Sequence, residues 1–107
     1  MMIIYQQQVT NEELEEKLNK NNIVILDVRE TEEYSTAHIP GSVLIPLGQL
    51  EERYHELDDN EEIYVICHSG ARSNAACLIL TDKGFKHVYN VVPGMCEWNG
   101  PIDSIYD

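Results

Sequence analysis

Two nearly uninterrupted runs of apolar residues constrain the fold of this chain more than any other feature of its sequence. Residues 23–28 read I-V-I-L-D-V and residues 63–66 read I-Y-V-I, so both are rich in β-branched side chains. A strand with one face in water alternates apolar and polar side chains, whereas a strand covered on both faces is apolar almost throughout. The two runs therefore predict inner strands of a parallel sheet.

The segments around these runs alternate between helical and extended patterns. Thr10 and Glu13 form a capping box, which predicts a helix over residues 11–20. Further helices are expected at residues 30–36, after Pro46 and over residues 72–83, and further strands at residues 2–7, 43–45 and 87–92. The alternation predicts the α/β fold class: one domain over residues 1–107, with a central, mainly parallel sheet of about five short strands flanked by helices on both faces.

The chain is strongly acidic, with 19 acidic and 7 basic residues and a formal charge of −12 over 107 residues. Such a surface repels phosphate backbones and anionic lipids, so we expect no nucleic acid and no membrane as partner. The first basic residue is Lys17, which predicts no targeting leader. The three cysteines are an odd number without a C-x-x-C pair, and the histidines are scattered. This pattern predicts a cytoplasmic location, no metal site and no cofactor.

The segment that follows the second apolar run has the residue types of a reactive cysteine site. Cys67 comes directly after the predicted strand, Gly70 allows a backbone turn with positive φ, and a helix begins near Arg72. The helix N-terminus and the guanidinium favour thiolate over thiol, and they favour an anion bound over the sulfur. The pattern predicts a cysteine nucleophile in an anion-binding loop. The alternative is a small buried cysteine at a strand end.

Four blocks of the chain resemble those of the rhodanese domain, a sulfurtransferase module. They are D-V-R at residues 27–29, E-Y with H-I-P-G-S at residues 33–42, C-H-S-G-A-R-S at residues 67–73, and P-G-M-C-E-W at residues 93–98. The blocks occur in the family's order over nearly the whole chain. The departures from the usual pattern are Ala37, Ser42, Leu44 and Pro93, all outside the loop that begins at Cys67.

The resemblance implies a sulfurtransferase in which Cys67 is the catalytic residue. Its thiolate would take the outer sulfur of a small anionic donor, thiosulfate or a persulfide, and become a persulfide itself. A thiol, cyanide or a protein acceptor would then remove that sulfur. Arg72 would position the donor, and the backbone N–H groups of the loop would hold the terminal sulfur. The residues expected to bind substrate are His68, Ser69, Gly70, Ala71 and Arg72.

Four polar residues before the cysteine are expected to support the site rather than to react. Arg29 and Glu33 are expected to form an ion pair that ties the strand end to the following helix. Asp27 is expected to cap the same turn. His38 is expected to be a hydrogen-bonded strut, because a cysteine that is already a thiolate needs no general base.

The remaining candidates lie in the last block and in the last long helix. Met95 and Trp98 are expected to form an apolar wall of the pocket, with core packing as the alternative. Cys77 falls on an apolar face at helical spacing, which predicts core packing. Cys96 lies in the block beside the site, where it could act as a resolving thiol or be a partly exposed bystander.

Two other functions use similar sequence features. Cysteine phosphatases and arsenate reductases share the strand, cysteine, loop and helix arrangement. Phosphatases of the protein-tyrosine and cell-cycle classes have a C-x5-R loop, usually after a histidine, whereas this chain has C-x4-R after Ile66. The other alternative is a docking, regulatory or sulfur-carrier module of the rhodanese type without turnover. The intact loop around Cys67 favours sulfur transfer over both.

Overall fold

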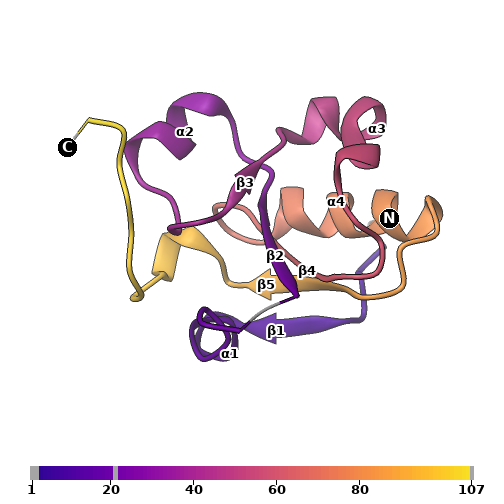
Figure 1. The fold of residues 1–107 in the computed structure, drawn as a ribbon, viewed down its shortest axis with the longest axis horizontal. Coiled ribbons are helices and arrows are strands. Elements are labelled where there is room, and N and C mark those ends of the chain that lie inside the picture. Colours follow the sequence, from indigo (N-terminus) through magenta and orange to yellow (C-terminus); the bar gives the residue numbers. More distant parts are fainter. Residues whose placement is uncertain (1–2, 21, 107) are drawn as a thin grey trace.

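The sheet of this protein consists of parallel strands in the order β1-β5-β4-β2-β3 (Figure 1). The computed structural model describes residues 3–20 and 22–106. Within them the strands are β1 (Gln8–Thr10), β2 (Ile23–Asp27), β3 (Val43–Leu44), β4 (Glu62–Ile66) and β5 (Val88–Val92). Every pairing between neighbouring strands is parallel. The predicted fold class is confirmed.

The two apolar runs form adjacent inner strands. β2 and β4 pair over their full length, from Ile23 opposite Glu62 to Asp27 opposite Ile66. Beyond the last pair, Val28 N–H donates to Ile66 O over 3.1 Å. Because the strands are parallel and in register, the chain after β2 and the chain after β4 leave the sheet at the same edge.

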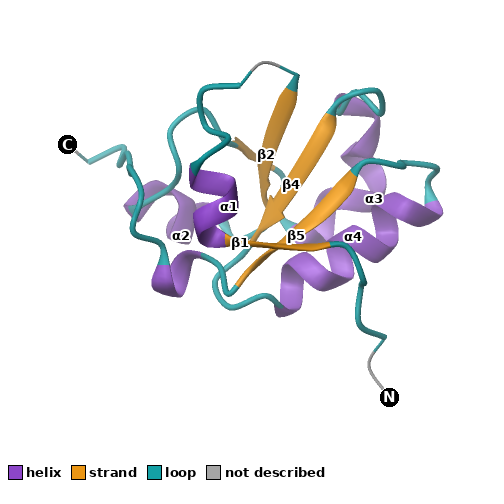
Figure 2. Cartoon of the chain, turned by 90° about the horizontal axis from the view of Figure 1, so that it is seen from below, coloured by secondary structure: helices purple, strands orange, loops and turns teal. Residues whose placement is uncertain are grey.

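Helices cover both faces of the sheet (Figure 2). They are α1 (Asn11–Glu15), α2 (Thr31–Thr36), α3 (Leu50–Arg53) and α4 (Ala71–Asp82), with 3-10 turns at Leu47–Gln49, Tyr54–Glu56 and Met95–Glu97. Leu50, Cys77 and Leu80 of α3 and α4 pack on one face, and Leu14 of α1 packs on the other. No helix in the described part of the chain is long and apolar enough to cross a membrane.

The N-terminal region differs from the sequence-based prediction. The strand expected at residues 2–7 is wrong, because β1 begins at Gln8, where it pairs with Asn90 of β5; Met2 lies outside the described residues. The capping box is confirmed: Glu13 N–H donates to Thr10 Oγ1, and Thr10 N–H donates to Glu13 Oε1. The helix ends at Glu15 rather than at residue 20. Acidic residues in its last turn oppose the helix dipole, which favours an early end.

Candidate active site

Cys67 lies at the carboxyl edge of the sheet, directly after β4, the strand between β2 and β5. The residue is only 1% exposed. From it the chain turns through residues 68–70 into α4. Loops at this edge of a parallel sheet are the usual place for ligand and active sites, so the fold puts the predicted nucleophile where a site is expected.

Two hydrogen-bonding groups contact the sulfur of Cys67. Gly70 N–H donates to Sγ over 3.1 Å, and the hydroxyl oxygen of Ser73 lies 3.2 Å from Sγ. Gly70 has a φ of 98°, a left-handed conformation that favours glycine, and it is the N-cap of α4. The partial positive charge of the helix N-terminus therefore lies next to the sulfur. Both groups can donate to a sulfur atom, and donors in this position favour a sulfur that bears negative charge.

The other residues of the loop surround its mouth. His68, Ser69 and Ala71 are exposed, while Gly70 and Arg72 are half-buried. Ser73 is a site residue that the patterns above did not single out, although it closes the block at residues 67–73. The signal was its place in the first turn of the predicted helix, since a hydroxyl there can reach back to the cysteine.

A second loop, residues 93–96, is hydrogen-bonded to the backbone of the cysteine loop and holds it in place. Met95 N–H donates to Cys67 O and Cys96 N–H donates to His68 O, each over 2.9 Å. These bonds depend on Gly94, whose φ is 114°. A Cβ at Gly94 would lie 2.6 Å from Cys67 O and 2.9 Å from His68 O, so the two loops meet as closely as they do only because this residue is glycine.

Arg72 is held by a carboxylate from another helix. Its Nη1 and Nη2 donate to Oε1 and Oε2 of Glu33 over 2.7 and 2.9 Å, and the two side chains are 35% and 34% exposed. The hydrogen bonds from Arg72 lower the pKa of Glu33 to about 2, and Glu33 raises the pKa of Arg72. The guanidinium expected to position the donor is therefore paired, and α2 is tied to the first turn of α4.

The ion pair expected between Arg29 and Glu33 is wrong. Arg29 pairs instead with Asp27 through Nη2 and Oδ2 at 2.9 Å, and both residues are buried. Asp27 Oδ1 also accepts from Arg29 N–H over 3.0 Å, and Arg29 Nη2 donates to Ala37 O over 2.7 Å. Arg29 thus joins the end of β2 to the end of α2, while Glu33 is left to meet Arg72.

His38 is fixed by its surroundings in the turn after α2. Its Nδ1 lies 2.6 Å from Tyr34 O, and its ring stacks on that of Tyr34 with 3.9 Å between centroids. Its backbone exchanges two hydrogen bonds with Asp103 in an isolated antiparallel bridge. These contacts are those of a strut between α2 and the C-terminal segment.

The two apolar residues of the last block and the two other cysteines have separate surroundings. Met95 and Trp98 are partly buried against the core that includes Leu14, which is the core-packing alternative. Cys77 is buried in α4, and burial raises the pKa of its thiol. Cys96 is exposed, on the loop whose backbone braces the site.

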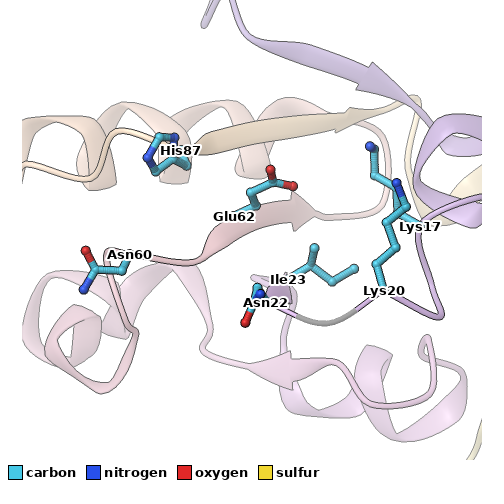
Figure 3. Close-up of a pocket in the computed structure, with 7 residues that line it drawn as sticks. All are labelled: Lys17, Lys20, Asn22, Ile23, Asn60, Glu62 and His87. Carbon is cyan, nitrogen blue, oxygen red and sulfur yellow. The ribbon is translucent and has the colours of Figure 1, made fainter.

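A hollow of about 350 Å³ lies at the opposite end of the sheet (Figure 3). It is lined by Lys17, Lys20, Asn22, Ile23, Asn60, Glu62 and His87. Ile23 and Glu62 begin the two inner strands, so the hollow is at the amino edge, remote from Cys67. Among the described residues, no group of three or more histidine, cysteine or acidic side chains is arranged to hold a metal ion.

Comparisons with known sequences cover most of the chain. Residues 10–101 match the Rhodanese-like domain family. YrkF of Bacillus subtilis, named as a proposed sulfur carrier protein, is 52% identical over 97 residues, which are 90% of this chain and 52% of YrkF. The chain thus spans about half the length of this relative. The thiosulfate sulfurtransferase GlpE of Coxiella burnetii is 31% identical, over 85% of this chain and 85% of GlpE.

Solved structures share the fold. A rhodanese-like domain protein from Staphylococcus aureus superposes with a TM-score of 0.85 at 30% identity, over 92% of this chain and 98% of the other. A structure described as rhodanese with anions from E. coli superposes with a TM-score of 0.70 at 32% identity, over 77% of this chain and 98% of the other.

Proposed function

Because this chain belongs to the rhodanese-like domain family, we propose that it is a sulfurtransferase that carries sulfane sulfur on Cys67. The observation that carries the proposal is the 3.1 Å hydrogen bond from Gly70 N–H to Sγ at the N-terminus of α4. Donors in this position stabilise a sulfur that bears negative charge. The attacking thiolate and the persulfide formed from it both carry such a charge.

The first half of the cycle loads the protein. The Cys67 thiolate attacks the outer sulfur of thiosulfate, a new S–S bond forms, and the old S–S bond breaks with its electron pair on the leaving sulfite. The product is Cys67–S–S⁻, and the total charge is the same before and after. With an organic persulfide as donor, the thiolate of the donor leaves instead of sulfite.

The second half of the cycle removes the sulfur from Cys67. A thiolate or cyanide attacks the terminal sulfur of the persulfide, and the Cys67 thiolate leaves with the electron pair of the broken bond. Because each half ends before the other begins, the cycle is of the ping-pong type. No external oxidant, reductant or cofactor is needed for either half to balance.

The bracing of the loop supports this role for its backbone. The carbonyl groups of Cys67 and His68 are taken up by the N–H groups of Met95 and Cys96. Those carbonyls consequently do not face the sulfur, where they would repel a second negative sulfur atom. The Gly70 N–H does point at the sulfur, and we expect the loop N–H groups to hold the terminal sulfur atom as the donors of an oxyanion hole hold oxygen.

The proposal is tested by sulfur loading. Incubation with thiosulfate is expected to raise the intact mass of the protein by one sulfur atom, and cyanide is expected to remove it as thiocyanate. Cys67→Ser should abolish the gain, whereas the matched variant Cys96→Ser should keep it. Loading that survives in Cys67→Ser, or a wild type that takes up no sulfur from thiosulfate or a persulfide, would overturn the proposal.

A sulfur-carrier function is a second candidate, favoured by the 52% identity to YrkF. A measurement of turnover distinguishes the sulfurtransferase function from the sulfur-carrier function. A sulfurtransferase converts many equivalents of donor in the presence of acceptor, with parallel double-reciprocal lines. A carrier takes up one sulfur per Cys67 and releases it only to a protein partner.

A further inference from the structure

The Glu33–Arg72 ion pair changes the electrostatics of the site. Arg72 is the only charged side chain in residues 67–81, so it is the only full positive charge that the loop and most of α4 supply. Two of its five N–H donors point at the Glu33 carboxylate in a fork-to-fork arrangement. The net charge of this pair of side chains is zero, so the positive potential that remains at the loop comes from backbone N–H groups and the helix N-terminus.

A sulfur donor with two negative charges competes with the Glu33 carboxylate for the Arg72 guanidinium. To use the Arg72 guanidinium, the donor has to displace the carboxylate or bind beside it against its charge. Both side chains are about a third exposed, so the pair can open at modest cost. A donor with one negative charge has less need of the guanidinium, because the partial positive charge of the α4 N-terminus also attracts it, and Glu33 repels it less.

We propose that Glu33 is a specificity-determining residue that acts through Arg72: it disfavours dianionic sulfur donors, such as thiosulfate, relative to donors with a single negative charge. The inference rests on the proposed sulfurtransferase function. It implies that thiosulfonates and organic persulfides are better donors for the native protein than free thiosulfate. Removing the charge of Glu33 should shift the preference back toward thiosulfate.

Glu33→Gln is a suitable variant because it keeps the fold of α2. Glu33 Oε1 accepts from Glu30 N–H over 3.0 Å as the third residue of a capping box, and a glutamine amide oxygen can accept the same bond. The matched control is Glu32→Gln, an exposed residue of the same helix with the same change of charge. A general effect of net charge would appear equally in both variants.

The decisive comparison uses two donors of similar shape, thiosulfate with two charges and methanethiosulfonate with one. In the second, methanesulfinate leaves in place of sulfite. At constant ionic strength, Glu33→Gln is expected to raise the ratio of kcat/KM for thiosulfate to that for methanethiosulfonate about tenfold, which corresponds to ~1.4 kcal/mol. Glu32→Gln should leave the ratio within about twofold of wild type. Equal shifts in the two variants, or no shift in Glu33→Gln, would overturn the inference.

A second measurement does not depend on turnover. In a Cys96→Ser background, the alkylation of Cys67 by neutral iodoacetamide is followed at increasing sulfate, an unreactive dianion. Glu33→Gln is expected to be protected at about tenfold lower sulfate than its Glu33 parent. Equal protection overturns the inference even if sulfur transfer is observed. Conversely, shifted protection in a protein that takes up no sulfur leaves the anion competition standing and overturns the sulfurtransferase proposal alone.

Discussion

Asn11 clamps Gly94 on both sides of its peptide backbone. The Asn11 amide nitrogen donates to Gly94 O over 2.9 Å, and its amide oxygen accepts from Gly94 N–H over 3.1 Å. Asn11 is 3% exposed and begins α1, so a helix on one face of the sheet fixes the loop that braces Cys67. The Asn11 side chain hydrogen-bonds both the N–H and the carbonyl of Gly94, as the backbone of a neighbouring strand would. Neither of these buried backbone groups is left unpaired.

Asn11→Ala should therefore destabilise the protein and weaken the site together. The substitution leaves the buried Gly94 N–H without a partner, while the Gly94 carbonyl keeps its 3.2 Å bond from Glu97 N–H, so we expect a cost of about 1–3 kcal/mol. Urea denaturation should show this loss, and the rate of sulfur loading should fall because the Cys67 loop is less firmly held. Asn19→Ala, at an exposed position nearby, should change stability by less than about 0.5 kcal/mol. Equal effects of the two variants would contradict the clamp.

Gly94→Ala is expected to be among the most damaging small substitutions in the chain. The new Cβ would lie 2.6 Å from Cys67 O, and the φ of 114° is costly for any other residue. We expect a loss of stability of more than about 2 kcal/mol, together with loss of sulfur loading. Gly48→Ala is the control, since nothing lies within 4 Å of its Cβ and its φ is not positive. Thermal unfolding and intact-mass measurements on both variants would check this, and normal loading in Gly94→Ala would refute it.

Ser73→Ala isolates the hydroxyl that contacts the sulfur. Ser73 is buried and its Oγ lies 3.2 Å from Sγ, so its loss removes one potential donor from the sulfur that becomes negatively charged in the proposed cycle, without a change of backbone. A hydrogen bond to a charged group contributes about 1.5–3 kcal/mol, so loading should slow at least about tenfold. Ser73→Thr, which keeps the hydroxyl, should recover part of the rate. A normal rate in Ser73→Ala would show that the hydroxyl is a packing feature only.

The stability of the Glu33–Arg72 pair should depend on pH in a defined window. The pKa of Glu33 falls from its usual 4.5 to about 2, mainly because of the hydrogen bonds from Arg72. A carboxylate with a depressed folded-state pKa stabilises the protein above its unfolded value, and the contribution is lost as the pH falls through the folded value. The difference in unfolding free energy between wild type and Glu33→Gln should thus be constant near neutrality and shrink from pH 4.5 toward 2.

Solvent screening limits the difference in unfolding free energy between wild type and Glu33→Gln. Both side chains of the pair are about a third exposed, which screens their attraction, so we expect no more than about 1 kcal/mol. Urea titrations of the two proteins at a series of pH values measure it. A difference that is largest in acid would reverse the sign and contradict the pairing.

The sequence predicted those parts of the fold whose signal is local. The apolar runs at residues 23–28 and 63–66 indicate inner parallel strands because burial on both faces leaves no polar alternation. The order of strands and helices then restricts the topology, since parallel neighbours need crossover helices. Cys67 and Gly70 were found for the same reason: a strand end, a glycine and a helix start are read along the chain.

The parts that were missed depend on which side chains meet in space. Four acidic residues lie within four positions of Arg29 in the sequence, namely Asp27, Glu30, Glu32 and Glu33, and nothing in the spacing ranks them. The choice is made by the position of Arg72, which is 39 residues away from Glu33 and takes its carboxylate. Asn11 gave no signal either, because an asparagine at a helix start is typical of a cap and its true partner is 83 residues away.

Ionic strength should affect the two donors differently. Eight acidic residues lie in residues 12–33 and seven in residues 51–62, so the body around the site repels an approaching anion. Raising the salt concentration toward 0.1 M shortens the screening length to about 10 Å, which weakens this repulsion and also loosens the half-buried Glu33–Arg72 pair. Both effects favour a dianion. Loading from thiosulfate is therefore expected to rise with salt at low ionic strength, and loading from methanethiosulfonate to rise less.

In Glu33→Gln only the general repulsion remains, so its thiosulfate profile should be shallower than that of wild type. Salt profiles that fall, or that are equally steep for both donors in wild type, would contradict this account.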